Sequence, residues 1–280
     1  MDRIDLHAHS TASDGTLSPT ELAKLGKSIG LRAMALTDHD TADGLDEYLA
    51  ACEEIGLEGV PAMETTMVVE GRDVHLVCLY FDYKTPEMKV WLEDLAASRT
   101  ERNEGMVKKL MDAGFNISLD DFKDVEGAMT RGHIGRVLVQ RGYADHPQKA
   151  VKQFLSKGTV GHVQRRTPDP ASFIKSIHKA GGLCFVAHLH QINPTDPEHC
   201  VAVARKMFEA GADGLETRYC EYNDTWRAKT EALAEEYGLL RSGGSDFHGG
   251  IKPGLNLGVG YGDLVVPYSY LEAIKAKLGR

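Results

Sequence analysis

Two short motifs place histidine and carboxylate side chains close together in the sequence. One is His7-Ala8-His9, followed by Asp14, and the other is GGSDFHG, which contains Asp246 and His248. Side chains two residues apart on a strand point to the same face, so the imidazoles of His7 and His9 can reach one metal ion. An HxH pair alone is a weak signal, because two surface histidines also occur at this spacing by chance.

Further ionisable residues lie in or directly after other apolar runs. The run that ends at Leu36 is followed by Thr37-Asp38-His39-Asp40, and another run ends at Glu64. His75 lies within a further run, and His188 follows one. Strand ends converge on the site in parallel α/β folds and barrels. Six strand-end positions with histidine or carboxylate therefore indicate a multinuclear metal centre rather than coincidence.

Short β-like runs alternate with helix-like stretches through most of the chain. The expected helices begin near Ser18 and cover 45–55, and the expected strands cover 3–7, 32–37, 59–63, 74–81, 182–187, 214–217 and 238–242. Repeated strand and helix alternation with apolar strands predicts a parallel α/β architecture, either open or closed into a barrel.

The alternation stops between about residues 86 and 166. Residues 87–113, 132–141 and 147–155 carry apolar side chains near helical spacing, so we expect a helical insertion in the α/β fold. Residues 131–166 contain eight Lys or Arg and one acid, a balance of +7. The rest of the chain then carries 24 bases and 40 acids, a balance of -16.

The composition bounds the class of protein. With 280 residues, 42% of them hydrophobic and 26% charged, the chain is expected to form one or two folded domains. The five cysteines form no CxxC pair, which disfavours a disulfide framework and a thiolate zinc site. The net charge of -9 disfavours binding to long duplex nucleic acid. No apolar run approaches the roughly 18 residues of a membrane span, so we expect a cytoplasmic protein without a membrane partner.

Taken in order, the motifs HAHSTASDG, LTDHD, PAMETT, DVHLVCLY, AHLH and GGSDFHG resemble those of the polymerase and histidinol phosphatase (PHP) superfamily of metal-dependent phosphoesterases. The insertion, with Thr130 to Arg136, resembles the small phosphoesterase branch. Members of that branch release the 3'-phosphate from 3',5'-bisphosphonucleotides, and relatives remove nucleotides from the 5' end of short RNA. The resemblance implies a distorted (β/α)7 TIM-like barrel formed by 1–85 and 167–280, with 86–166 as a substrate-binding helical insertion domain.

The resemblance also implies a centre of two or three divalent metal ions. The implied ligands are His7, His9, Glu64 and Asp246 for the most buried ion, Glu64, His75 and His188 for a second, and Asp14, His39 and His248 for a third. Leu189 and His190 follow His188 where relatives often have proline, which leaves His190 as an alternative ligand. Mixed imidazole and carboxylate ligands favour manganese, with iron and zinc as alternatives.

Clustered divalent metals suit phosphoester hydrolysis, because they lower the pKa of a bridging water and neutralise phosphoryl oxygens. The expected nucleophile is a metal-bridging hydroxide held by Glu64, His75, His188 and Asp246. Basic side chains of the insertion would grip a second phosphate. The expected residues are Arg99, Arg131, His133, Arg136 and Lys157, with three of them, 131, 133 and 136, on about one face of a helix. The alternative is a solvated basic helix face.

The expected reaction is removal of the 3'-phosphate from a 3',5'-bisphosphonucleotide such as adenosine 3',5'-bisphosphate. A 5'-to-3' exoribonuclease that acts on short RNA could use the same site. Histidinol phosphate phosphatase activity is a further alternative, although a monophosphate needs no second anion site. A non-catalytic metal-binding module and an amide-hydrolysing metal enzyme are the remaining alternatives.

Overall fold

Seven strands follow one another around the sheet in chain order in the computed structural model, which describes residues 2–125 and 129–280. They are β1 (Ile4–Asp5), β2 (Ala33–Leu36), β3 (Glu58–Val69), β4 (Arg72–Leu79), β5 (Leu183–Val186), β6 (Gly214–Tyr219) and β7 (Leu240–Gly244). The two ends of the sheet meet just beyond β1 and β7. The amide of Leu6 donates to Gly243 O at 3.0 Å, and the amide of Asp246 donates to His7 O at 2.8 Å. The sheet therefore curves into a nearly closed barrel, as expected.

Strand β4 runs antiparallel to both of its neighbours, whereas the other strand pairs are parallel. The expected parallel arrangement therefore does not hold for this strand. Glu70 and Gly71, with φ of 51° and 69°, form a two-residue hairpin turn between β3 and β4, so no helix separates these strands. Because β4 is reversed, His75 near its start lies beside the carboxyl ends of the other strands.

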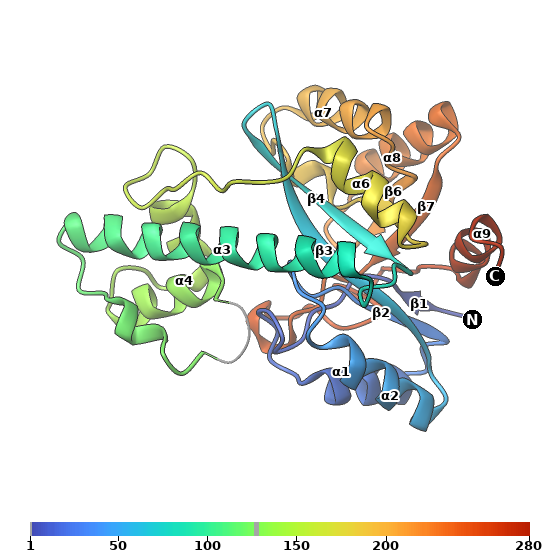
Figure 1. The fold of residues 1–280 in the computed structure, drawn as a ribbon, viewed down its shortest axis with the longest axis horizontal. Coiled ribbons are helices and arrows are strands. Elements are labelled where there is room, and N and C mark those ends of the chain that lie inside the picture. The colour runs from blue at the N-terminus through green and yellow to red at the C-terminus, as the bar shows by residue number, and fades with distance from the viewer. Residues whose placement is uncertain (1, 126–128) are drawn as a thin grey trace.

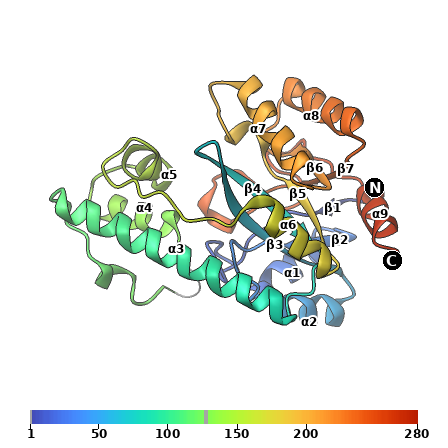
Figure 2. The ribbon, with the colours of Figure 1, turned by 45° about the horizontal axis from the view of Figure 1, so that its top comes forward.

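Helices cover the outside of the barrel (Figures 1 and 2). The helices outside the insertion are α1 (Pro19–Ser28), α2 (Leu45–Ile55), α6 (Pro170–Lys179), α7 (Pro197–Glu209), α8 (Asp224–Tyr237) and α9 (Tyr268–Lys277). Helix α1 begins where the sequence predicts, because the Ser18 and Glu21 side chains each accept a hydrogen bond from the other residue's amide. No helix in the described ranges is long and apolar enough to cross a bilayer.

Helix α3 (Pro86–Asp112) is long and extends away from the barrel (Figure 1). Near its start, Met88 and Leu95 belong to the apolar core of the barrel. Near its end, Met106 and Leu110 belong to a second apolar cluster. One continuous helix therefore contributes to both hydrophobic cores.

The second cluster is built by the short helices that lie beside the outer half of α3. These are η1 (Leu119–Phe122), α4 (Arg131–Gln140), α5 (Pro147–Ala150) and the π-helical turn Val151–Leu155. Ile134 and Leu138 of α4 are fully buried in it. Residues 86–166 accordingly remain our proposed insertion domain, with α3 shared between the two cores.

A buried ion cluster fixes α3 and the returning chain to the barrel. Asp40 follows β2, and its Oδ2 accepts hydrogen bonds from Arg99 of α3 and, at 2.7 Å, from Arg165 before α6. Thr65 donates to the other carboxylate oxygen at 2.7 Å. Burial raises the pKa of Asp40, but the two guanidinium groups outweigh it and hold the pKa well below its usual range.

Replacing Asp40 with Asn should lower the free energy of unfolding by about 3–5 kcal/mol, because two guanidinium groups would stay buried without their counter-charge. The stabilising contribution of Asp40 is present at neutral pH and is lost as the pH falls toward its depressed folded-state pKa. Urea unfolding at pH 7 and in acid measures both effects. In the control Asp145→Asn, only an exposed pair with Lys149 is lost, so the free energy of unfolding should change little. Equal losses in the two variants would contradict this anchoring role.

Candidate metal centre and cavity

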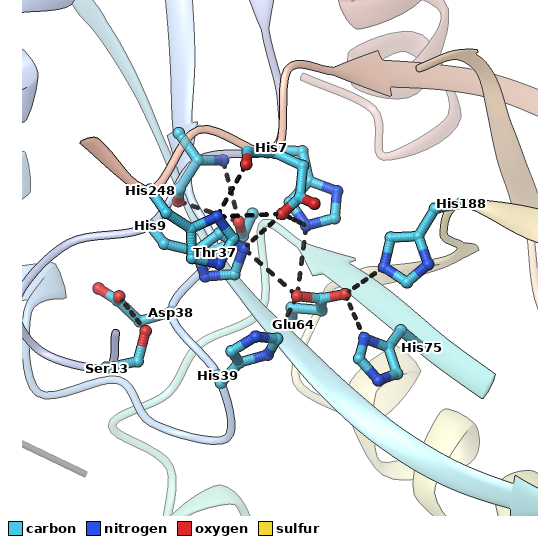
Figure 3. A network of polar contacts seen from close by, with 12 residues as sticks. His7, His9, Ser13, Thr37, Asp38, His39, Glu64, His75, His188 and His248 are labelled. Carbon is cyan, nitrogen blue, oxygen red and sulfur yellow. Dashed lines mark hydrogen bonds and ion pairs between the residues drawn. The ribbon is translucent and has the colours of Figure 1, made fainter. Parts of the chain in front are cut away.

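Glu64 lies at the centre of a cluster of imidazoles (Figure 3). Its Oε1 lies 2.7 Å from His75 Nδ1 and 2.8 Å from His188 Nε2. Its Oε2 lies 3.0 Å from His39 Nδ1. Burial raises the pKa of Glu64, but the neighbouring histidines outweigh it and hold the pKa well below its ordinary value. Glu64 is therefore an anionic carboxylate that faces histidines on two sides, as a bridging metal ligand must.

The most buried group comprises His7, His9, Glu64 and Asp246, whose ligand atoms all lie within 4.8 Å of one another. The Nε2 atoms of His7 and His9 both lie 3.3 Å from Glu64 Oε2. The distance from Asp246 Oδ1 is 3.5 Å for His7 Nε2 and 3.2 Å for His9 Nε2. Both Nε2 atoms are buried, and neither has a hydrogen-bond partner among the described residues. Buried imidazole nitrogens that face two carboxylates without hydrogen bonds fit a divalent metal ion.

A second group lies closer to the surface and consists of His9, Asp14, His39 and His248. His248 Nε2 lies 3.3 Å from Asp14 Oδ1, and His39 Nε2 lies 4.0 Å from the same atom. His39 also forms a group with Glu64 and His75. With His188, which contacts Glu64, all nine side chains expected as ligands lie in one cluster, and His9, His39 and Glu64 each belong to two groups.

A cavity of about 240 Å³ separates this cluster from the insertion. The metal-centre side of the cavity is lined by Asp14, His39, His75, His248 and Lys252. The insertion side is lined by Arg99, Arg102, Thr130, Arg131, Arg136 and Gln148, with apolar contributions from Pro147 and Val151. The cavity therefore has potential metal ligands on one side and four guanidinium groups on the other.

The sequence pattern of the PHP domain family matches residues 5–158, more than half of the chain. The chain belongs to the PHP family. Among its PHP relatives, a 5'-3' exoribonuclease of Haemophilus influenzae is 38% identical over 263 residues, which are 91% of this chain and 94% of the relative. A 3',5'-nucleoside bisphosphate phosphatase of Chromobacterium violaceum is 29% identical, covering 92% of this chain and 91% of the relative.

Solved structures of similar proteins agree with this PHP assignment. A Bifidobacterium adolescentis protein, named for a predicted metal-dependent phosphoesterase activity, matches with a TM-score of 0.86 and 28% identity over 100% of this chain and 99% of its own. An amidohydrolase of Chromobacterium violaceum with bound sulfate matches with a TM-score of 0.83 and 29% identity over 91% and 90%. The expected fold and enzyme class are confirmed: the protein is a metal-dependent phosphoester hydrolase with a TIM-like PHP barrel.

The two histidines after β5 differ in their surroundings in this PHP chain. His188, with a φ of 26°, turns sharply out of the strand and contacts Glu64. The amide of His188 donates to Glu216 Oε2 at 2.7 Å. His190 instead lies 3.1 Å from Glu221 Oε2, outside the cluster. His188 is therefore the better candidate ligand.

Glu216 is a site residue to which no motif pointed. It lies on β6, and its Oε1 lies 2.8 Å from His7 Nδ1, so the other ring nitrogen of His7 faces Glu64. Together with the amide of His188, this contact lets one carboxylate orient two proposed ligands. The sequence did offer one indication of Glu216. It is an acid within the expected strand 214–217, and acids are rarely buried in the strands of a barrel.

Two other buried aspartates hold the loops that carry proposed ligands. Asp5 accepts hydrogen bonds from the amides of His7 and Ser245 at 3.1 and 3.0 Å, next to the ligand positions 7 and 246. Asp38 accepts from the amide of Ser10 at 2.8 Å and from Ser13 Oγ at 2.6 Å (Figure 3). These bonds fix the chain on either side of the proposed ligands, as the polar surroundings of metal sites commonly do.

Two residues expected to bind substrate do not line the cavity. His133 lies about 200° around α4 from Arg131, because each residue of an α-helix adds about 100°, so its side chain borders a neighbouring depression instead. Burial and Arg136 lower the pKa of His133 to about 4, so the ring is neutral at pH 7. Lys157 lies beyond the π-helical turn, and its Nζ donates to Gly71 O at 3.1 Å.

The remaining expected residues line the cavity but differ in their partners. Arg99 is engaged by Asp40, and Arg131 lies 3.5 Å from Asp73. Arg136 has no ion-pair partner within 4.0 Å among the described residues. It is therefore the expected residue that is best placed to receive an anion.

Arg102 is a further cavity residue that was not expected. It is 6% exposed, and its Nε donates to Asn103 Oδ1 at 3.0 Å. Burial and the nearby guanidinium groups lower its pKa well below the usual value, which shows how poorly its charge is compensated. It belongs to a stripe of α3 at helical spacing, Leu95, Arg99, Arg102 and Met106, and two arginines between apolar residues on one helix face were the available signal.

Replacing Glu216 with Gln should weaken manganese binding about 10- to 100-fold, because His7 loses the charged partner that orients its ring. Calorimetric titration of chelator-treated protein with Mn²⁺ measures the affinity. The matched control is Glu221→Gln, which alters a carboxylate that also contacts a histidine, His190, but lies outside the cluster. Unchanged manganese affinity in the Glu216 variant would show that this carboxylate does not support the metal centre.

Proposed function

We propose that this PHP enzyme hydrolyses the bond between phosphorus and the 3'-oxygen of a nucleotide that also carries a 5'-phosphate. The observation that supports the proposal is the cavity, which is lined by four of the clustered potential metal ligands at one side and by arginines at the other. Our first candidate substrate is a 3',5'-bisphosphonucleotide such as adenosine 3',5'-bisphosphate. Water attacks phosphorus, the bond to the 3'-oxygen breaks, and a 5'-mononucleotide and inorganic phosphate are released.

The nine clustered side chains would hold two or three divalent ions, and the donor set favours manganese over iron and zinc. Such ions would activate water and neutralise phosphoryl oxygens. The chain itself would orient the substrate, because a phosphate at the insertion side can meet the guanidinium groups of Arg102, Arg131 and Arg136. Asp40 pairs with Arg99 and Arg165, and no ion pair with Arg102 or Arg136 is found among the described residues, so this side keeps excess positive charge.

Short RNA with a 5'-phosphate is the second candidate, favoured by the 38% identity to a 5'-3' exoribonuclease. The bond broken is the same, since cleavage next to the first 3'-oxygen also releases a 5'-mononucleotide. Lys149 and Lys152 are exposed on the short helices whose neighbouring residues Gln148 and Val151 line the cavity. These ammonium groups could attract the phosphates of a longer chain. The two candidate substrates differ only in the group that keeps the phosphorus: the phosphorus leaves as inorganic phosphate from the bisphosphonucleotide and stays on the shortened chain of the RNA.

Turnover of a small substrate panel tests the proposal. The kcat/KM for adenosine 3',5'-bisphosphate and for a 5'-phosphorylated tetraribonucleotide should each be about 10- to 100-fold higher than for the same compound without its 5'-phosphate. The reason is that each lost charged hydrogen bond costs about 1.5–3 kcal/mol. Histidinol phosphate should be turned over poorly. Hydrolysis of neither 5'-phosphorylated substrate with Mn²⁺, Fe²⁺ or Zn²⁺ would refute the proposal. Equal rates with and without the 5'-phosphate would refute the role of the arginines.

Replacing Arg136 with Ala should raise the KM for the bisphosphonucleotide about 10- to 100-fold through loss of a charge-assisted contact. The same variant should act on adenosine 3'-monophosphate like the parent enzyme. Arg141→Ala is the matched control, because Arg141 is at the end of the same helix but pairs with Asp121 outside the cavity. An unchanged KM for the bisphosphonucleotide in the Arg136 variant would contradict the proposed phosphate grip.

A further inference from the structure

Lys252 places an ammonium group beside a proposed metal ligand. The short turn η4 (Gly249–Ile251) begins directly after His248, and Lys252 is the first residue after this turn. Its Nζ lies 2.5 Å from Asp246 Oδ2 and 3.4 Å from Asp246 O. The side chain is only 13% exposed, yet it lines the same cavity as His39 and His248. No sequence motif pointed to this residue.

The two carboxylate oxygens of Asp246 have different partners. Oδ1 faces the Nε2 atoms of His7 and His9, at 3.5 and 3.2 Å. Oδ2 accepts a hydrogen bond from Tyr219 OH at 2.8 Å and also contacts Lys252. Lys252 therefore does not occupy the oxygen atom that faces the histidines, and its contact with Asp246 is compatible with a metal ion bound there.

The ammonium group of Lys252 has bonding capacity that Asp246 does not use. An ammonium group has three N–H donors, and the contacts found for it among residues 2–125 and 129–280 are the two with Asp246. One N–H of the ammonium group is thus available at the wall of the cavity.

The position of this cation complements the arginines. Arg131 and Arg136 line the insertion side of the cavity, whereas Lys252 lines the side of the proposed metal centre. A phosphoryl group seated next to His39, His75 and His248 would lie beside Lys252. Negative charge is spread over the non-bridging oxygens during phosphoryl transfer, so a fixed cation there stabilises the transition state.

We propose that Lys252 is a catalytic residue that contacts a non-bridging oxygen of the phosphoryl group during its transfer to water. Tyr219, in contrast, is a positioning residue that acts only through Asp246, because it is fully buried and does not line the cavity. The inference rests on the proposed position of the metal centre. It does not depend on which nucleotide is the substrate, since phosphomonoesters and phosphodiesters both carry non-bridging oxygens.

The test compares Lys252→Met and Lys252→Arg with the matched control Tyr219→Phe, which removes the other partner of Asp246 Oδ2. In Lys252→Met, Mn²⁺ content should equal that of the parent enzyme, and kcat/KM should fall by about 10²–10³-fold. Calorimetry of the manganese-loaded protein should show at least a tenfold loss of affinity for inorganic phosphate, expected from one lost charged hydrogen bond. Lys252→Arg should recover part of both losses. Tyr219→Phe should weaken Mn²⁺ binding and leave phosphate affinity unchanged.

The opposite pattern would overturn the proposal. If Lys252→Met loses manganese to the same extent as Tyr219→Phe and keeps its phosphate affinity once saturated with metal, Lys252 acts only through Asp246. Failure of Lys252→Arg to recover any phosphate affinity would also count against a direct contact. Titration with inorganic phosphate keeps this test separate from the proposed substrate: if the parent enzyme hydrolyses neither nucleotide, the proposed function fails while the phosphate affinities still decide the role of Lys252.

Discussion

The interaction on which the site depends is the burial of one carboxylate, Glu64, among imidazoles from four different parts of the chain. A buried anion is stable only where positive or metal-binding groups surround it. The fold meets this requirement because β1, β2 and β5 each deliver a histidine at the barrel end where β3 carries Glu64. The reversed strand β4 adds His75 by pairing it with Thr66 on β3. Closure of the barrel therefore brings the proposed metal ligands together.

The side chains that cluster around Glu64 could be predicted from the sequence because their pattern is local. A histidine or acid at the end of an apolar run can be recognised in the sequence alone, and His7, Glu64 and His188 are all residues of this kind. Strand direction was not visible in the same way. The reversal at Glu70 and Gly71 depends on a two-residue turn, which apolar periodicity does not distinguish from a longer connection.

The parts that escaped prediction depend on long-range packing. Glu216 matters because β6 places it beside His7, more than 200 residues away in sequence. Arg99 was expected to bind substrate, but its guanidinium group is engaged by Asp40, so it mainly joins the insertion to the barrel. Arg102, one helical turn further along α3, has no such counter-charge in direct contact among the described residues. Arg99 and Arg102 therefore have different partners because of the tertiary structure, although they lie on the same face of one helix.

The shared helix α3 also bears on how the enzyme can select by size. Its 27 residues form an unbroken rod of about 40 Å at 1.5 Å per residue, with one end packed in the barrel core and the other in the core of the insertion. Bending between the two parts would break main-chain hydrogen bonds of the rod as well as the Asp40 cluster. The distance between the proposed metal ligands and the arginines is therefore fixed by this helix, and in the function we propose the two phosphates of one nucleoside would span it.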